Sequence, residues 1–436
     1  MKTLKSIPIS KIHRASKLVQ TGAKVGVNYL KYYSDKMVNP QEDAKERLDA
    51  SNATDIYDSL KHLKGSALKL AQMLSMEKTI LPQAYVDKFS LSQFSVPPLS
   101  APLVMKTFKK SFGQYPSQIF DTFNAKAVNA ASIGQVHKAS KNGLDLAVKI
   151  QYPGIANSIL SDLAIVKPIT MKMFNIKSDH SDAYFKEVEH KLLEETNYDL
   201  ELEQSEVVVA ACHHIPNIIF PKYYSKWSSK QIITMDWMEG VHLSEFSKTN
   251  TNRDRANAVG QALWDFYLYQ MHVLRKVHAD PHPGNFLVSE NGELIAIDFG
   301  CMKAIPDEFY TPYFELFNRT ILNDSQFFQN KLFELEILRA EDTDTEIAFF
   351  KTIFHDVLDF FTQPFDANTF DFSDPEFFGK ISTIGEHYYT STASSKMNAD
   401  RGSKHFIYMN RTFFGLFSLL FDLKADRIVI NNYKTL

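Results

Sequence analysis

The sequence predicts an α+β fold with a small β-containing N-lobe and a helical C-lobe. Runs rich in β-branched residues, such as 145–150 and 231–235, lie in the middle of the chain and predict strands. After Gly240 the pattern is mainly helical, with short strand-like pieces at 286–288 and 294–297. The expected segments are 1–50, 51–100, 101–240 and 241–436.

The composition is that of an ordinary globular protein. Of the 436 residues, 44% are hydrophobic and 23% are charged, which allows a large core. A formal net charge of −3 gives no global field, so no nucleic-acid partner is expected. Two cysteines, Cys212 and Cys301, are too few for a disulfide framework and favour a reducing compartment. No apolar stretch reaches the ~18–20 residues of a membrane span, and 413–421 is predicted to be a core helix.

The first 34 residues are basic and contain no acidic residue. They lack the long apolar region of a secretory signal. Three interpretations fit this composition: a solvated tail, a helix attracted to anionic lipid, and an organelle transit peptide. The sequence does not choose among them.

A helix with two distinct faces is predicted over residues 56–74, with Asp55 near its positive end. Its apolar stripe, at spacings of four and three, consists of Ile56, Leu60, Leu63, Ala67, Leu70 and Leu74. Another face carries Gly65, Lys69 and Gln72, which can approach a second backbone and offer hydrogen-bond donors. The alternative is a polar face turned to solvent.

The segment with the strongest chemical signal is His278-Ala279-Asp280-Pro281-His282-Pro283-Gly284-Asn285. Asp298-Phe299-Gly300 follows it, after a hairpin expected to turn at Asn291-Gly292. This order matches the kinase catalytic loop H-x-D-x-x-x-x-N and the D-F-G triplet. Asp280 would then orient or deprotonate an attacking hydroxyl or water. Asn285 and Asp298 would supply oxygen ligands to Mg²⁺.

Upstream, residues 146–150 predict a buried strand that presents one lysine, Lys149. This pattern matches the V-A-I-K element, whose lysine contacts nucleotide phosphates. Taken alone, a lysine in a strand is more often an edge charge; its place upstream of the catalytic loop in the kinase order favours the phosphate contact. Segment 130–137, with Ala130, Ala131 and Ser132, stands where a kinase has its glycine-rich phosphate loop. It contains one glycine, so its contact with phosphates should differ from that of ordinary kinases.

Two further elements complete the kinase order. Residues 194–201 are predicted to be helical, and one glutamate there should pair with Lys149. Glu201 is favoured and Glu195 is left for another task, whereas a solvated acidic face is the alternative. Residues 232–240 predict a strand and a hinge at which adenine would bind backbone groups. The candidates there are Met235, Trp237 and Met238.

Together these residues resemble the UbiB (AarF) family of atypical kinases. The resemblance covers roughly residues 59–305 and is carried by the catalytic loop, the alanine-rich loop before 135–137, and helix 64–75. It implies a protein-kinase-like fold in which an N-terminal helical extension covers the active site. It also implies binding of ATP and Mg²⁺, weak kinase or ATPase activity, and a supporting role in isoprenoid-quinone biosynthesis or membrane lipid handling.

The resemblance assigns Lys69 and Gln72 to the family's K-x-G-Q motif and Glu195 to its E-x-D motif. The chain departs from the family pattern at three positions. Ala71 replaces the K-x-G-Q glycine, Asn129 replaces the first alanine of the loop, and Asn197 replaces the E-x-D aspartate. These departures put the Mg²⁺ affinity and the degree of active-site closure in question.

Two functions from different classes fit these features. The first is an ATPase or small-molecule kinase that acts on an isoprenoid-quinone precursor or a lipid and contacts a membrane peripherally. The second is a nucleotide-gated binding module with little phosphoryl transfer. The expected location is cytoplasmic and peripheral at the inner membrane in a bacterium, or mitochondrial or plastid in a eukaryote. A homodimer is compatible with the sequence. An ordinary protein kinase is disfavoured because no A-P-E-like element follows Asp298 at the usual distance.

Overall fold

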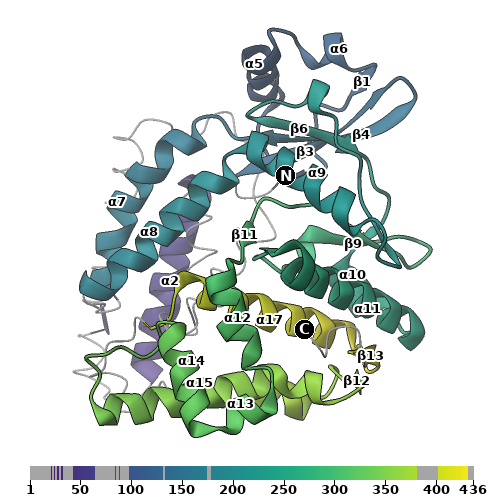
Figure 1. Cartoon of the computed structure of the whole chain (residues 1–436). Helices are drawn as coiled ribbons and strands as arrows, with labels where there is room; N and C mark the ends of the chain where they lie inside the picture. The colour runs from purple at the N-terminus through teal and green to yellow at the C-terminus, as the bar shows by residue number, and fades with distance from the viewer. Residues whose placement is uncertain are drawn as a thin grey trace. The chain divides into compact units, whose positions relative to one another are not determined.

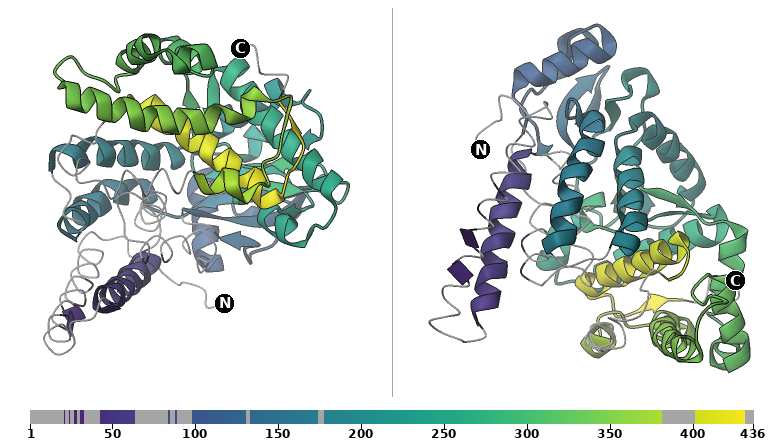
Figure 2. Two further views of the ribbon diagram at one scale, coloured as in Figure 1. Left: turned by 90° about the horizontal axis from the view of Figure 1, so that it is seen from below. Right: turned by 90° about the vertical axis from the view of Figure 1, so that its left-hand side faces the viewer.

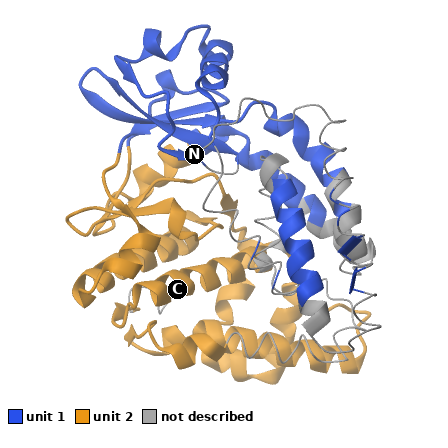
Figure 3. Cartoon of the chain, turned by 180° about the vertical axis from the view of Figure 1, so that it is seen from behind, with its two compact units in different colours: residues 1–202, 222–237 blue, residues 203–221, 238–436 orange. Residues whose placement is uncertain are grey.

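The chain forms two compact units (Figure 3). The computed structural model describes residues 43–63, 98–130, 133–173, 178–380 and 401–430, with a few positions between 21 and 88. The first unit comprises residues 1–202 and 222–237, and the second comprises 203–221 and 238–436. Helix α9 (Tyr198–Cys212) begins in the first unit and ends in the second.

An antiparallel sheet with the order β1-β3-β4-β6 organises the first unit, and β2 also pairs with β3. Its strands are β1 (Thr122–Phe123), β2 (Asn129–Ala130), β3 (Gly134–Lys141), β4 (Leu144–Gln151) and β6 (Ile232–Asp236). Asn142 and Gly143 join β3 to β4 with positive φ angles of 52° and 78°, as a tight hairpin turn requires. The strands expected at 145–150 and 231–235 are therefore present as β4 and β6.

One face of this sheet forms the core of the first unit. Leu146, Val148 and Ile150 alternate along β4 and are fully buried, as the period of two along a strand dictates. They belong to one apolar cluster with Val104 and Phe108 of helix α5 (Ala101–Phe112). Lys149 lies on the opposite face of β4, so the packing of α5 leaves that face for other contacts.

Helix α2 (Asp43–Leu63) corrects one expectation. It begins well before Asp55, so the prediction that Asp55 lies near a helix start is wrong. Asp55 instead accepts a hydrogen bond of 2.9 Å from the Asn28 amide, and the Lys24 ammonium lies 3.6 Å away. Leu60 is buried, as its place in the apolar stripe predicts. The face with Gly65, Lys69 and Gln72 lies outside the described residues.

Residues 194–201 do not form one continuous helix, contrary to the prediction. Helix α8 (Ser178–Glu195), which packs against α7 (Ile155–Met173), ends at Glu195, and α9 begins at Tyr198 (Figure 1). The Asn197 side chain accepts a 3.3 Å hydrogen bond from the Leu200 N–H, which is how asparagine caps a helix start. The break follows from this capping and from a hydrogen bond that fixes the Thr196 carbonyl to the Gln151 amide at 2.9 Å.

The second unit contains a four-stranded sheet in the order β5-β10-β9-β7 and two two-stranded sheets, β11-β8 and β12-β13. Its strands are β5 (Ile218–Ile219), β7 (Val241–His242), β8 (Lys276–His278), β9 (Phe286–Val288), β10 (Leu294–Ala296), β11 (Met302–Ala304), β12 (Thr369–Phe370) and β13 (Ile428–Val429). The hairpin expected at Asn291-Gly292 joins β9 to β10, and Gly292 has a φ of +88°. That angle suits glycine because it lacks a Cβ.

Helices form the rest of the second unit. The longer ones are α11 (Arg253–Tyr269), α14 (Ser325–Glu334), α15 (Asp344–Thr362) and α17 (Lys404–Leu423). Segment 413–421 is a core helix, as predicted, because Phe413, Leu416, Phe417 and Leu420 of α17 are fully buried. Figure 2 shows α17 beside α15, where the Phe360 and Phe417 rings lie 6.0 Å apart. Within the described residues, no helix is long and apolar enough to cross a membrane.

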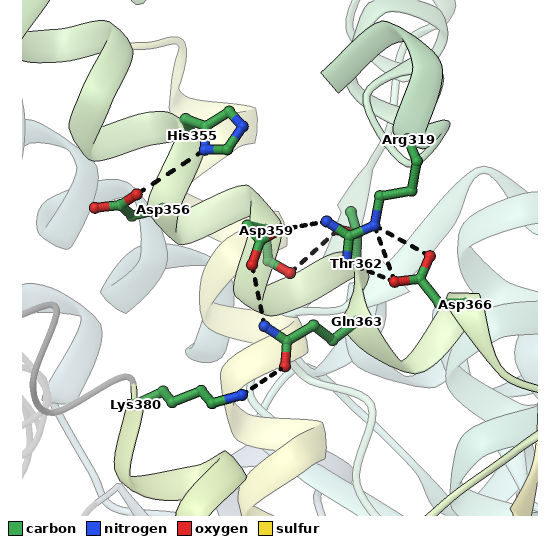
Figure 4. A network of polar contacts seen from close by, with 8 residues as sticks. All are labelled: Arg319, His355, Asp356, Asp359, Thr362, Gln363, Asp366 and Lys380. Carbon is green, nitrogen blue, oxygen red and sulfur yellow. Dashed lines mark hydrogen bonds and ion pairs between the residues drawn. The ribbon is translucent and has the colours of Figure 1, made fainter. Parts of the chain in front are cut away.

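A polar network in the second unit ties α13 (Arg319–Asn323) to α15 (Figure 4). The Arg319 guanidinium forms an ion pair with Asp359 of α15 and a second one, at 2.6 Å, with Asp366. The Asp359 carboxylate also accepts from the Gln363 amide at 3.1 Å. A planar guanidinium can serve two carboxylates at once, so one residue fixes the spacing of these segments.

Candidate functional site

Two backbone ladders in the second unit bring the catalytic-loop segment beside the D-F-G segment. In the hairpin, Phe286 pairs with Ala296, and one step further the Ile297 N–H donates to the Asn285 carbonyl at 3.0 Å. Asn285 therefore lies next to the residue that precedes Asp298. The backbone fixes this proximity, so it does not depend on the two side chains.

The second ladder repeats the arrangement for Asp280. Strands β8 and β11 pair with His278 opposite Met302, and the Ala279 N–H then donates to the Cys301 carbonyl at 2.9 Å. Asp280 follows at once on one segment, and Gly300 precedes on the other. Both ends of segment 280–285 are thus held against segment 297–301 by backbone hydrogen bonds, one to Ile297 and one, through Ala279, to Cys301.

Local hydrogen bonds orient the polar side chains within this interval. The Asn285 amide donates to the Asp280 carbonyl at 2.9 Å. One carboxylate oxygen of Asp298 accepts from the Gly300 N–H at 2.9 Å. Asp280, Asn285 and Asp298 are all half-buried. The segment therefore presents two carboxylates and one amide at defined positions, partly sheltered from water.

The chemistry of these donors fits a magnesium ion. Mg²⁺ binds hard oxygen ligands and usually takes one or two protein side chains together with phosphate oxygens. Because the Asn285 NH₂ group donates to a carbonyl, the amide oxygen is the atom directed elsewhere. Asn285 and Asp298 would hold the ion.

Apolar packing holds the D-F-G segment in place. Phe299 of the D-F-G triplet is buried, with its ring 6.4 Å from that of Phe266 and 6.4 Å from that of His278. The His278 N–H donates to the Gln270 side chain at 2.9 Å. Burial, and the nearby Asp280 and Cys301, raise the pKa of Tyr267 well above its usual value. Tyr267 therefore stays neutral beside the acidic segment.

In the first unit, Lys149 of β4 forms a buried ion pair with Glu201 of α9. The ammonium lies 2.6 Å from the carboxylate, and the two side chains are 17% and 6% exposed. The glutamate favoured by the sequence is thus the one in contact. The Tyr198 ring lies under the ammonium, with its centroid 5.3 Å away. Lys149 is held by a charge on one side and an aromatic face on another.

The alanine-rich loop is only partly described. Asn129 and Ala130 form β2 and pair with Val136 and Gln135 of β3, whereas Ala131 and Ser132 lie outside the described residues. A Cβ added at Gly134 would come within 2.8 Å of the Tyr198 hydroxyl and 2.9 Å of the Ile150 carbonyl. Glycine is required there because Tyr198 and β4 already occupy the space.

At the predicted hinge, β6 ends at Asp236. Met235 is buried within the sheet, where it pairs with Ala147. The Trp237 N–H donates to the Asp145 carbonyl at 2.9 Å, and its ring faces the Lys138 ammonium at 4.9 Å. Met238 begins the next stretch of the second unit. Adenine binding at Met235, Trp237 or Met238 stays a prediction.

The residues assigned to the two family motifs differ in whether the structure describes them. Glu195 is the last residue of α8 and is half-buried. Lys69 and Gln72 lie outside the described residues, and so does Ala71. Their predicted contact with the nucleotide, together with the covering role of the helical extension, stays a prediction.

Comparison with known proteins places the kinase-like pattern in a family. The model described as the ABC1 atypical kinase-like domain matches residues 91–332, which is more than half of the chain. The chain belongs to the ABC1 atypical kinase-like family. The match includes Lys149, Glu201, Asp280, Asn285 and Asp298.

Curated relatives of this ABC1 protein carry kinase names. The protein ACTIVITY OF BC1 COMPLEX KINASE 8, chloroplastic, of Arabidopsis thaliana is 29% identical over 258 residues, 57% of this chain and 34% of the relative. AarF domain-containing protein kinase 1 of Xenopus tropicalis is 26% identical over 322 residues, 72% of this chain and 62% of the relative. The chain thus spans about a third to three-fifths of these relatives. The expected membership of the UbiB (AarF) family is confirmed.

A solved structure supports the fold. The Mycobacterium tuberculosis protein Rv3197, determined as a complex with erythromycin, has 22% sequence identity and a TM-score of 0.58. The superposition covers 90% of this chain and 97% of that one. At this identity the likeness concerns the fold alone. With the family match, it confirms the predicted α+β protein-kinase-like fold.

Sequence patterns missed three residues beside the candidate site. Tyr198 lies under Lys149, whereas Arg411 and Gly415 of α17 contact the catalytic loop. The last two stand beyond residue 332, where the ABC1 match ends. An arginine and a glycine within a largely apolar helix were the available signal, since each is unfavourable in a buried stretch unless it meets a partner.

Proposed function

We propose that this ABC1 protein is an atypical kinase-like enzyme that binds ATP with Mg²⁺. It hydrolyses ATP or transfers the terminal phosphoryl group to a small or lipid-linked acceptor. The observation that carries this proposal is the pair of ladders that aligns Asp280, Asn285 and Asp298 on adjoining segments. The buried ion pair between Lys149 and Glu201 supports it, because kinases need the same lysine and glutamate in place.

Each residue has a defined task in this proposal. Bound Mg·ATP supplies the electrophilic phosphoryl group. Lys149 neutralises phosphate oxygens while Glu201 keeps its ammonium in position. Asp280 orients the attacking hydroxyl or water and accepts its proton. The Asn285 amide oxygen and the Asp298 carboxylate hold the ion.

We further propose that the enzyme supports isoprenoid-quinone biosynthesis or membrane lipid homeostasis at a membrane surface. The basic, acid-free residues 1–34 favour contact with anionic lipid. The location that fits is the inner-membrane surface in a bacterium, or a mitochondrion or plastid in a eukaryote. The name of the chloroplastic Arabidopsis relative favours a plastid among the eukaryotic locations.

ATP turnover under membrane conditions tests the proposal. Phosphate release by the full chain would be measured with Mg·ATP alone, with anionic liposomes, and with liposomes that contain an isoprenoid-quinone precursor. We expect turnover that liposomes or precursor increase and that Asp298→Asn abolishes. Turnover that neither additive changes would overturn the membrane and substrate assignment. Turnover unaffected by Asp298→Asn would overturn the assignment of the site.

A nucleotide-gated binding module is the second candidate, and one observation favours it. At the E-x-D aspartate position the chain has Asn197, whose oxygen accepts the Leu200 N–H and caps α9. A residue used in this way brings no additional charge to a metal. This candidate predicts that Mg·ATP binds and changes liposome affinity while phosphate release stays at the level of Asp298→Asn.

A further inference from the structure

The last long helix, α17, contacts the catalytic loop at three points within the second unit. The Arg411 guanidinium lies 3.5 Å from the Asp280 carboxylate. Gly415 lies against Pro281. Tyr408 forms an apolar cluster with Ala279 and Cys301. All three residues of α17 follow residue 332, the last residue of the ABC1 match.

These three residues lie on one face of the helix. Arg411 follows Tyr408 by three positions, and Gly415 follows Arg411 by four, so a helix with 3.6 residues per turn aligns them. Their partners, residues 279–281, are consecutive. One stripe of α17 therefore runs along the start of the catalytic loop.

Gly415 shows how closely the two backbones approach. A Cβ at this position would lie 2.2 Å from Cγ of Pro281 and 3.2 Å from its carbonyl oxygen. Glycine in a helix interior costs about 1 kcal/mol relative to alanine. Its presence here is explained by the contact, because any larger residue would separate α17 from the loop.

The Arg411 guanidinium places a positive charge beside the Asp280 carboxylate. The two side chains are 20% and 17% exposed, so water screens their attraction less than at an open surface. A second polar contact anchors the same turn of α17, because the Asn410 amide oxygen accepts from the Tyr313 hydroxyl at 2.9 Å. The arginine thus reaches Asp280 from a turn of α17 that a second hydrogen bond fixes.

The residue between His278 and Asp280 points to a difference from protein kinases. Their signature at this place is H-R-D, with arginine before the aspartate, and arginines are the groups that pair with phosphorylated activation loops. Here the middle residue is Ala279, which is fully buried against Tyr408. The catalytic aspartate has an arginine beside it, but α17 supplies that arginine.

We propose that Arg411 is a positioning residue for Asp280, and that α17 holds the catalytic loop in its working conformation without a phosphorylated activation loop. This inference rests on the proposed function in one respect, since it takes Asp280 to act on the nucleophile. Arg411 acts through Asp280, which it orients by charge, while Gly415 and Tyr408 set the distance between helix and loop.

Hydrogen exchange tests the contact without any need for activity. Amide exchange of residues 278–288 would be compared for the wild-type chain, Arg411→Ala, and Arg427→Ala as a matched control. Arg427 follows α17 and pairs with Asp254 in an exposed ion pair. We expect exchange about 10-fold faster in Arg411→Ala and unchanged in Arg427→Ala. Equal exchange in all three proteins would overturn the proposal.

Turnover then tests the positioning role. We expect Arg411→Ala to lower kcat for ATP hydrolysis about 10- to 100-fold with KM nearly unchanged. In an Asp280→Asn background the same substitution should have no further effect. Equal losses in both backgrounds would show that Arg411 acts independently of Asp280. If Arg411→Ala does not fold, Arg411→Lys carries the test and should lose about 3- to 10-fold in kcat.

The two proposals fail in different ways. If the wild type releases no phosphate but loop exchange is still faster in Arg411→Ala, the proposed function is overturned. The contact between α17 and the catalytic loop is then still supported. Gly415→Ala adds an independent variant, which we expect to accelerate loop exchange and lower kcat. Its control, Gly379→Ala, places a methyl group where nothing lies within 4 Å and should change neither. Identical behaviour of the two alanine variants would overturn the role of α17.

Discussion

The two units hold their chemically important residues by different means. In the first unit, Lys149 is held by an ion pair with Glu201, 52 residues later in the chain, and by the ring of Tyr198. In the second unit, Asp280, Asn285 and Asp298 are fixed by backbone ladders, and Asp280 also contacts Arg411, 131 residues away. The first arrangement depends on side chains, and the second depends on backbone hydrogen bonds and on the packing of a helix.

This difference predicts different sensitivities. Removing one partner of a buried ion pair leaves an uncompensated charge, so the first unit should lose stability when either side chain is truncated. Ladder hydrogen bonds do not involve side chains, so substitutions at Asn285 or Asp298 should leave the second unit folded. Loss of function and loss of stability should therefore separate between the units.

The largest expected effect is on nucleotide response at Asp298. Mg·ATP should raise the melting temperature of the wild type, and ATP without a divalent ion should not. Asp298→Asn should remove most of this rise and keep the unliganded melting temperature within about 2 °C, because the change is confined to one half-buried side chain. The control is Asp307→Asn, at an exposed helix start. A full ATP response in Asp298→Asn would exclude this residue as a metal ligand.

The next largest effect concerns the ion pair of the first unit. Lys149→Ala should lower the free energy of unfolding by about 3 kcal/mol, because it leaves the Glu201 carboxylate buried without its ammonium. Lys138→Ala removes an exposed pair with Asp145 on the same sheet and should cost at most about 1 kcal/mol. Urea unfolding measures both values. Similar losses in the two variants would contradict the importance assigned to burial.

A smaller effect is expected at Gly134. Alanine there would press on the Tyr198 hydroxyl and on the Ile150 carbonyl, so we expect a loss of about 1–3 kcal/mol in unfolding free energy. Because Tyr198 also lies under Lys149, the affinity for Mg·ATP should fall as well. Calorimetric titration alongside urea unfolding measures both. Stability equal to that of the wild type would contradict the close packing of Gly134 against Tyr198.

The smallest effect is a pH dependence in the second unit. Burial raises the pKa of Asp265, on α11, to about 6, above the ordinary value of about 3.9 for an unfolded chain. The folded state therefore binds this proton more tightly, and stability should rise as the pH falls from about 7 to 5. Asp265→Asn should remove that part of the dependence. Parallel curves for the two proteins in urea unfolding at pH 5, 6 and 7 would contradict the assignment.

The sequence predicted what short patterns encode. The strand that carries Lys149, the hairpin at Asn291-Gly292 and the order of the kinase motifs all follow from residues within a few positions of one another. The contact of Lys149 with Glu201 was accessible as well, because kinases pair this lysine with a glutamate on a helix that follows its strand. These features place most of the candidate site.

The features that the sequence did not predict depend on contacts between distant residues or on competition between local signals. The break at Thr196-Asn197 is a capping event that the surrounding helical pattern concealed, although asparagine before a helix is a known start signal. The start of α2 at Asp43 could not be predicted from the apolar stripe, because that stripe begins only at Ile56. The contact of Arg411 with Asp280 requires the packing of α17, which no short pattern encodes.

The role proposed for Asp280 is tested by Mg²⁺-dependent phosphate release from ATP, measured for the wild-type chain and for Asp280→Asn. If Asp280 accepts the proton of the attacking group, the wild type should release phosphate and Asp280→Asn should be slower by about 100-fold or more, since general-base groups contribute about 10²- to 10⁴-fold. Both proteins should bind Mg·ATP with the same affinity, because the metal ligands are intact. Equal release rates for the two proteins would show that Asp280 is not the general base.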